Sequence, residues 1–322
     1  MGYEGHHLSV NPIIDFSMSS LNPGTPEWDA IKSQVLKAGE DYGCFIALLD
    51  RLGPEVRKGI TNELKHLFDL PTETKMLNLH RLPLSGYVGQ LPIVPSYESL
   101  GIGDPSSLEN IKSFSDMLRP EGRPSFSENV ELFTKPAFEL ESLVKRIVLE
   151  SLGVDKYLDE LKDSTSYNLR VMRYEKLQNV DTDELGLVPH YDKNFITILH
   201  QLQSDGLELE TKDGEWIKIK PSPGSFIVLF GESFHAWTNG RLRPGGHRVV
   251  MSGDQPRYSM GLFSDLKEDF LVKAPDELVD EEHPLIFKHF KFKELVNILV
   301  KEVSTIEVPQ RCNLCVDAFR NV

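Results

Sequence analysis

The chain has 322 residues, of which 40% are hydrophobic and 26% are charged, a composition typical of a folded globular protein and not of a disordered one. The net charge of −14 argues against nucleic-acid binding, which depends on Lys and Arg side chains that neutralise phosphates. No apolar run approaches the ~20 residues that a membrane-spanning helix needs, the first residues lack a signal-peptide pattern, and three cysteines are too few for a disulfide framework, so we expect a cytoplasmic protein.

Helical and extended patterns alternate over the first 70 residues. Residues 11–16 and 43–49 predict short strands, and residues 28–42 and 54–70 predict helices with apolar side chains at helical spacing. The following residues 80–127 are rich in Pro, Gly and Ser, which favours loops.

Two aromatic residues of these predicted loops, Tyr87 and Phe114, are candidates for a lid over a substrate pocket. The alternative is that both rings only anchor the loops, since sequence says little about loop geometry.

The middle of the chain predicts a long helix followed by a two-faced strand. Residues 126–152 carry apolar side chains at helical spacing, as expected for a helix packed on a sheet. Residues 166–177 alternate, so that Arg170 and Tyr174 share one face. Arg170 then points into the mouth of a pocket or is a solvated charge at a strand end.

The remaining chain predicts several strands and a closing helix. A Lys-Asp-Gly turn between two alternating segments is a strong hairpin signal. The predicted strands cover residues 195–202, 206–210, 216–220, 224–230, 247–251 and 257–263, and the chain from residue 282 onward is predicted to be helical.

Two imidazoles and one carboxylate stand out as candidate metal ligands: His190, Asp192 and His247. A lone His-x-Asp is a weak signal that occurs on many surfaces. Here His190 and Asp192 would share a face if their segment is extended, and His247 begins a later predicted strand. Two His and one carboxylate with open coordination positions are the ligands of an oxygen-activating non-haem Fe(II) site.

A candidate carboxylate-binding pair follows the third ligand. Arg257 and Ser259 share one face of a predicted strand. A planar guanidinium and a hydroxyl suit a carboxylate that must bind in one orientation. The alternative is that Arg257 pairs with a surface acid.

The order His190-x-Asp192, His247, Arg257-x-Ser259 resembles the plant soluble class of Fe(II)/2-oxoglutarate-dependent dioxygenases. The resemblance extends over roughly residues 11 to 300, including the segments 12–16, 41–45 and 237–241. Within that class, residues 43–45, 172–174 and 234–237 are most similar to the branch that contains the alkenyl- and hydroxyalkyl-producing enzymes of glucosinolate side chains.

The resemblance and the strand pattern together imply a fold. We expect a mostly β protein with helices: a distorted double-stranded β-helix, or jelly roll, with a helical N-terminal region. The implied division is an N-terminal non-haem dioxygenase region at 11–125, a jelly-roll core with its backing helix at 126–300, and a C-terminal helical tail at 301–322.

The resemblance also implies the chemistry. Fe(II) is held by the triad, 2-oxoglutarate and dioxygen are co-substrates, and ascorbate is a possible activator. The distal carboxylate of 2-oxoglutarate meets Arg257 and Ser259, and Tyr174 matches a tyrosine that binds the same co-substrate. Hydroxylation is the default outcome, with desaturation, demethylation or ring closure as variants. Candidate substrate contacts are Phe263, Phe195, Phe114, Arg170 and Tyr87.

Two alternatives stay open at this point: an ascorbate-dependent iron oxidase of the same fold, and a non-catalytic jelly roll that binds a small molecule. The expected partner is a small-molecule substrate, with no nucleic acid and no membrane, and the expected state is a monomer. Cys312 and Cys315 form an isolated CxxC that we expect to be dispensable. His200 and His235 are expected to be structural.

Overall fold

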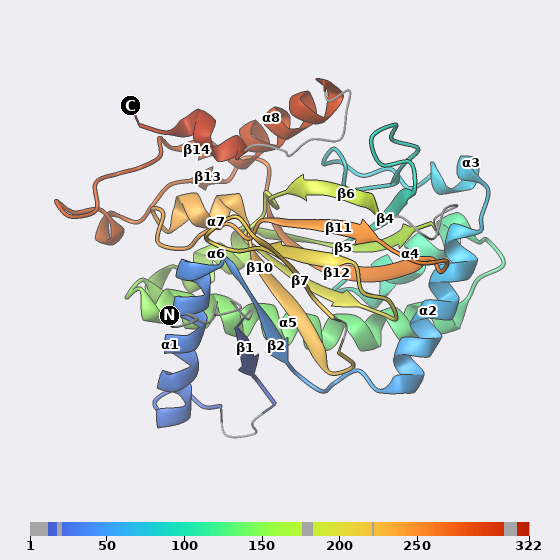
Figure 1. The fold of residues 1–322 in the computed structure, drawn as a ribbon, viewed down its shortest axis with the longest axis horizontal. Coiled ribbons are helices and arrows are strands. Elements are labelled where there is room, and N and C mark those ends of the chain that lie inside the picture. Colours follow the sequence, from blue (N-terminus) through green and yellow to red (C-terminus); the bar gives the residue numbers. More distant parts are fainter. Residues whose placement is uncertain (1–11, 18–20, 176–182, 221, 306–313, 322) are drawn as a thin grey trace, which may run out of the picture.

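The computed structural model describes residues 12–17, 21–175, 183–220, 222–305 and 314–321. Two sheets dominate it (Figure 1). The larger runs in the order β1-β2-β10-β7-β12-β5-β4-β3 and the smaller in the order β6-β11-β8-β9. The larger sheet contains β1 (Ile13–Asp15), β2 (Cys44–Leu48), β3 (Val88–Gly89), β4 (Tyr97–Gly103), β5 (Thr165–Tyr174), β7 (Ile196–Gln201), β10 (Ser225–Phe230) and β12 (Arg257–Leu266).

The smaller sheet contains β6 (Glu184–His190), β8 (Leu207–Glu210), β9 (Trp216–Lys218) and β11 (His247–Met251), and β13 (Leu271–Val272) pairs separately with β14 (Phe290–Lys291). The predicted jelly roll with helices is confirmed. The helices are α1 (Pro26–Asp41), α2 (Pro54–Phe68), α3 (Thr72–Lys75), α4 (Leu108–Leu118), α5 (Pro124–Ser151), α6 (Leu158–Ser164), α7 (Glu232–Trp237), α8 (Phe292–Thr305) and the short 3-10 helices η1 (Asp155–Tyr157), η2 (Asp276–Leu278) and η3 (Cys315–Phe319).

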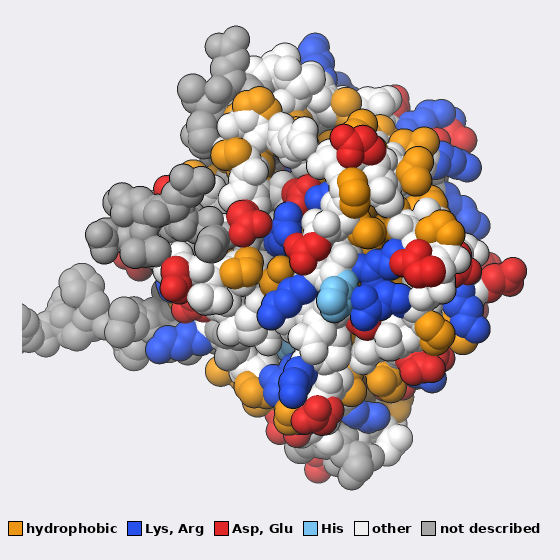
Figure 2. All heavy atoms as spheres, turned by 90° about the vertical axis from the view of Figure 1, so that its right-hand side faces the viewer, with side chains coloured by type: hydrophobic (Ala, Val, Ile, Leu, Met, Phe, Trp, Pro, Cys, Tyr) orange, Lys and Arg blue, Asp and Glu red, His pale blue; other side chains and the backbone are white. Residues whose placement is uncertain are grey.

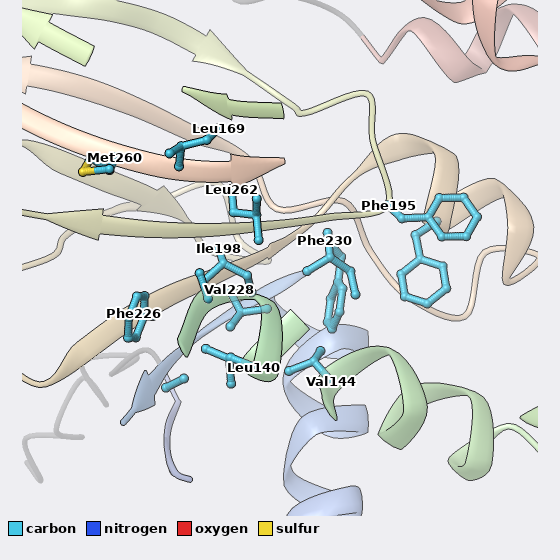
Figure 3. Packing of buried hydrophobic residues seen from close by; sticks show 14 of the residues in the cluster. Leu140, Val144, Leu169, Phe195, Ile198, Phe226, Val228, Phe230, Met260 and Leu262 are labelled. Atoms are coloured by element: carbon cyan, nitrogen blue, oxygen red, sulfur yellow. The ribbon is translucent and has the colours of Figure 1, made fainter. Parts of the chain in front are cut away.

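The long helix α5 covers one face of the larger sheet, whereas α8 lies on the opposite side, beyond the smaller sheet (Figure 1). Leu140 and Val144 of α5 pack toward Ile198 and Val228 of the sheet (Figure 3). This face is a closed apolar core, and the alternation of each strand leaves the opposite face for other side chains. The face of the molecule in Figure 2 carries acidic and basic side chains intermingled with scattered apolar ones.

The prediction of loops throughout 80–127 was wrong. Tyr97–Gly103 forms β4, which pairs with β5 along its whole length, and Leu108–Leu118 forms α4. Gly101 is one of the glycines whose number favoured loops here. A Cβ at this position would lie 1.7 Å from the carbonyl oxygen of Ser85, so glycine is required here by a close backbone approach.

The prediction of a helix from residue 282 was also wrong at its start, because α8 begins only at Phe292. Lys291 belongs instead to β14, which pairs with β13. The division of the chain into three parts remains a prediction. In the structure, strands from the first part share the larger sheet with the core, and α8 runs through the boundary expected at residue 300.

Candidate active site

Two histidines lie side by side on adjacent strands of the smaller sheet. His190 ends β6 and His247 begins β11, and the two residues are paired in register with ring centroids 4.1 Å apart. The Nδ1 atom of His190 lies 2.8 Å from the carbonyl oxygen of Val188, and that of His247 lies 3.0 Å from the carbonyl oxygen of Gly245. Since a carbonyl only accepts, each Nδ1 donates, which leaves both Nε2 lone pairs available to a metal ion.

Asp192 completes this group from a turn and not from a strand. β6 ends at His190, so the expected shared strand face was wrong in detail. The turn is held because the Asp192 carbonyl accepts from the backbone N–H of Glu232 at 2.8 Å. The Asp192 Oδ1 atom then lies 3.9 Å from His190 Nε2 and 3.8 Å from His247 Nε2.

The other carboxylate oxygen of Asp192 is held by Thr197. The Thr197 hydroxyl donates to Oδ2 at 2.6 Å, which directs Oδ1 toward the two imidazoles. Thr197 lies on β7 and was missed in the sequence, where a threonine five residues after an aspartate is no signal by itself.

The three side chains fit a divalent metal ion. Their ligand atoms all lie within 4.8 Å of one another, and each histidine has its second nitrogen fixed by a carbonyl, as in protein metal sites. Burial lowers the pKa of His190 to about 3, with the neighbouring His247 adding to this effect and Asp192 opposing it. The ring is therefore neutral, as a ligand must be. Two imidazoles and one carboxylate match non-haem Fe(II).

A buried guanidinium lies on the larger sheet in the same cavity. Arg257 is 1% exposed, and it donates to Ser259 Oγ at 3.2 Å and to Gln201 Oε1 at 2.9 Å. Its guanidinium carbon lies 4.8 Å from the centre of the Tyr174 ring. Burial lowers the pKa of Arg257 and Tyr174 opposes this. None of the described acids forms a salt bridge with Arg257, and its Nε atom has no hydrogen-bond partner among them.

An unpaired buried cation is costly. The Arg257 guanidinium is therefore suited to bind an anionic group of a ligand. Ser259 and Tyr174, the other predicted members of the group, line the same cavity. Gln201 was missed in the sequence analysis. Its place on β7, two residues apart from Leu199 and four from Thr197, puts it on the cavity side of the strand.

The triad and Arg257 open into one cavity of about 250 Å³ between the two sheets. Most of its wall is apolar. The wall includes four residues of α8: Phe292, Val296, Leu299 and Val303. The sequence pattern predicted only that this part of the chain is helical.

Two of the five predicted substrate contacts line the cavity: Phe263 and Arg170. The guanidinium of Arg170 donates to the Leu84 carbonyl oxygen and to Ser99 Oγ, so the alternative of a solvated charge was wrong.

The other three predicted contacts lie outside the cavity wall. Phe195 is 1% exposed and stacks on Phe234 with ring centroids 4.7 Å apart, and Phe114 of α4 stacks on Phe126 at 5.7 Å. Both rings belong to the apolar core, so their prediction as substrate contacts was wrong. Tyr87 donates to Glu98 at 2.6 Å and serves to anchor its segment.

Two further histidines are hydrogen-bonded to carbonyl oxygens, as predicted for structural residues: His200 to Ser225 at 2.8 Å and His235 to Leu242 at 2.6 Å. Cys315 is buried beside Glu302. Cys312 lies outside the described residues, so the dispensability of the pair remains a prediction.

Comparison with known proteins agrees with this geometry. Residues 167–265 match the model of the 2OG-Fe(II) oxygenase superfamily, and residues 12–93 match that of the non-haem dioxygenase in morphine synthesis N-terminal family. The chain is 45% identical to the probable 2-oxoglutarate-dependent dioxygenase AOP1.2 of Arabidopsis thaliana, over 92% of both chains. The chain belongs to the 2-oxoglutarate/Fe(II) oxygenase family.

More distant relatives extend the comparison. The 2-oxoglutarate-dependent dioxygenase AOP3 of Arabidopsis thaliana is 31% identical, over 91% of this chain and 94% of that one. The crystal structure of a rice dioxygenase for auxin oxidation is similar over 97% of this chain and 100% of that chain, with a TM-score of 0.79 and 28% identity. An Arabidopsis thaliana counterpart was solved with 2-oxoglutarate, with a TM-score of 0.75, 28% identity and coverage of 85% and 100%.

This oxygenase is an oxidoreductase that uses Fe(II), 2-oxoglutarate and dioxygen. Within the described part of the chain, no helix is both long enough and apolar enough to cross a membrane.

Proposed function

We propose that His190, Asp192 and His247 hold the Fe(II) ion of this dioxygenase and that Arg257 and Ser259 bind the distal carboxylate of 2-oxoglutarate. The observation that carries the proposal is the shared cavity. Two free Nε2 atoms and one carboxylate oxygen converge at one place in it, and a buried guanidinium that forms no salt bridge with any described residue lies at another.

The side chains of the chain have distinct tasks in this account. When bound, Fe(II) supplies the redox chemistry that couples decarboxylation of 2-oxoglutarate to oxidation of the substrate. The carbonyls of Val188 and Gly245 hold both imidazoles in the tautomer that leaves Nε2 free. Thr197 keeps the Asp192 carboxylate from rotating.

Arg257 orients the co-substrate. Gln201 and Ser259 each accept one of its N–H groups, so the planar guanidinium is fixed before a ligand arrives. A fixed bidentate donor binds a carboxylate in one orientation. Tyr174 lies against the guanidinium and limits its movement. The apolar walls of the cavity exclude water from the reacting groups.

We infer that the substrate is a small plant specialised metabolite and that hydroxylation is the default outcome, with desaturation, demethylation or ring closure as variants. Similarity to AOP1.2 and AOP3 and the largely apolar cavity support this inference. The names of those relatives and the 2-oxoglutarate complex of the Arabidopsis auxin-oxidising enzyme favour 2-oxoglutarate over an ascorbate-dependent oxidation. A non-catalytic binder would have no use for three converging ligands. We further expect a cytoplasmic monomer, with ascorbate as an activator.

A metabolite screen tests the proposed substrate class. Purified protein with Fe(II) and 2-oxoglutarate is offered plant metabolites, and succinate is measured together with the mass of each metabolite. The proposal predicts succinate in equal amount to a product with a matching mass change, and no turnover when ascorbate replaces 2-oxoglutarate. Turnover with ascorbate alone would contradict it. Size-exclusion chromatography tests the monomer.

A further inference from the structure

Among the described residues that line the cavity, Asp265 is an acid to which the proposed chemistry gives no role. It lies at the far end of β12 from Arg257, on the same side of the strand as Phe263, and it lines the cavity. Its pairing partner on β5 is Ser166. Among the described residues the Asp265 carboxylate has no hydrogen bond and no salt bridge, whereas the hydroxyl of the preceding residue, Ser264, donates to the Ile196 carbonyl at 2.9 Å and so anchors the strand.

The other charged groups of the cavity are already engaged. Arg170 donates to Leu84 and Ser99, so it holds its surroundings and does not reach out as a free donor. Lys193 donates to the carbonyl of Tyr191 at 2.9 Å and to the Glu232 carboxylate. The triad and Arg257 are assigned to the metal ion and 2-oxoglutarate.

The surroundings of Asp265 disfavour the charged form of its carboxyl group. Burial raises the pKa of Asp265 to about 7, with Asp192 adding to this effect and Arg170 opposing it. Asp265 is half-buried and lines the cavity, so a bound ligand would remove its remaining contact with water, which is costly unless the ligand supplies a donor. A ligand that brings a donor restores that interaction, whereas a ligand that brings a second anion adds repulsion.

We propose that Asp265 is a specificity-determining residue that accepts a hydrogen bond from an amine or hydroxyl group on an otherwise apolar substrate. Leu82, Val296 and Leu299 of the cavity wall would contact the apolar body. This proposal rests on the proposed function and narrows its substrate class. It excludes substrates whose only polar group near Asp265 is an anion.

Binding of matched small molecules tests the proposal on the full chain, loaded with 2-oxoglutarate and with Mn(II) in place of Fe(II) so that no turnover occurs. The compounds are phenethylamine, 2-phenylethanol and phenylacetate, and the corresponding naphthyl series. Dissociation constants are measured by calorimetry for the wild type, Asp265→Asn and Asp265→Leu. The Asp254→Asn variant is the control, because it makes the same change in charge at an exposed residue between β11 and β12.

We expect the wild type to bind the amine and the alcohol more tightly than the carboxylate. A charge-assisted hydrogen bond corresponds to roughly a 10- to 150-fold change in affinity. Asp265→Asn is expected to lose that factor for the amine and to keep most of the affinity for the alcohol, since an amide oxygen still accepts. Asp265→Leu is expected to lose it for both compounds, and the control is expected to change neither.

The proposal is overturned if no amine or alcohol of the two series binds, if the carboxylates bind best, or if Asp265→Leu keeps the wild-type order. Titration of 2-oxoglutarate into each Mn(II)-loaded protein comes first and separates two kinds of failure. If the wild type does not bind 2-oxoglutarate, the proposed function is overturned. If it binds 2-oxoglutarate but does not bind the amine and the alcohol more tightly than the carboxylate, only the role of Asp265 is overturned.

Discussion

The two faces of the larger sheet use the same strands for different purposes. On β12, Met260 and Leu262 point into the core beneath α5, while Arg257 and Ser259 point into the cavity. On β5, Leu169 packs into the core and Tyr174 lines the cavity. The core face is apolar and closed, whereas the cavity face carries polar groups whose hydrogen-bonding capacity is not used up. A strand that is held firmly on one side can present reactive groups at fixed positions on the other.

Substitutions on the cavity face are therefore expected to change catalysis or ligand binding and to leave the free energy of unfolding unchanged. Substitutions on the core face are expected to lower the free energy of unfolding and to leave ligand binding unchanged. The largest effect is expected for Asp192→Ala. Loss of the only carboxylate of the triad should reduce turnover to the background rate, since enzymes exceed that rate by on the order of 10⁶ or more. Succinate formation with a metabolite found in the screen measures the loss. An unchanged unfolding midpoint is expected, and residual turnover above background would contradict the assignment.

Leu262→Ala is the matched change on the core face. Leu262 is 0% exposed and lies between β5 and β7 (Figure 3). Removing such a side chain typically lowers the free energy of unfolding by about 2–5 kcal/mol. Urea unfolding measures it, and the affinity for 2-oxoglutarate is expected to be that of the wild type. A stable variant with weakened 2-oxoglutarate binding would show that the two faces are not independent.

Arg257→Lys is expected to weaken 2-oxoglutarate binding and nothing else. Lysine keeps the charge but loses the planar guanidinium, and the loss of a charge-assisted contact costs ~1.5–3 kcal/mol, or roughly 10- to 150-fold in apparent affinity. Titration of 2-oxoglutarate measures this. Arg248→Lys on β11 is the control, because the Arg248 side chain points to the opposite face of the strand from that of His247 and donates to Glu208 at 2.7 Å. An unchanged titration for Arg257→Lys would end the assignment.

Thr197→Val should have the smallest effect. Valine keeps the shape of the side chain but removes the hydroxyl that holds Asp192. Loss of a hydrogen bond to a metal ligand typically weakens metal affinity by roughly 10- to 100-fold. Competition with a chelator measures the affinity, with Thr134→Val as the control, since Thr134 is a buried threonine of α5 that donates to Glu131. Equal affinities in the two variants would contradict the role of Thr197.

Sequence patterns were sufficient for the parts of the site that lie on regular strands. Alternation placed Arg257 with Ser259 and Arg170 with Tyr174, because every second side chain of a strand faces the same way. The triad was predicted from its residue types and strand context, because the His-x-Asp spacing alone is a weak signal. Asp192 shows the limit of alternation, since its position comes from a turn held by the N–H of Glu232.

The failures arose where position depends on distant parts of the chain. Phe114 and Phe195 are aromatic and close in sequence to predicted loops or ligands, but their rings are buried by α5 and α7. Gly101 looks like a loop residue because the need for a close approach to Ser85 cannot be seen in local sequence. Asp265 continues the alternation of β12, but only the structure shows that it lines the cavity and that its carboxylate has no hydrogen bond to any described residue.

The most direct test of the contrast between the two faces is the number of Fe(II) ions bound per chain after anaerobic equilibrium dialysis. It is measured in parallel for the wild type, Asp192→Ala and Leu262→Ala. Because the ligands lie on the cavity side and Leu262 supports only the core, the expected result is one ion for the wild type, none for Asp192→Ala and one for Leu262→Ala. Undiminished iron in Asp192→Ala, or its loss in folded Leu262→Ala, would contradict this account.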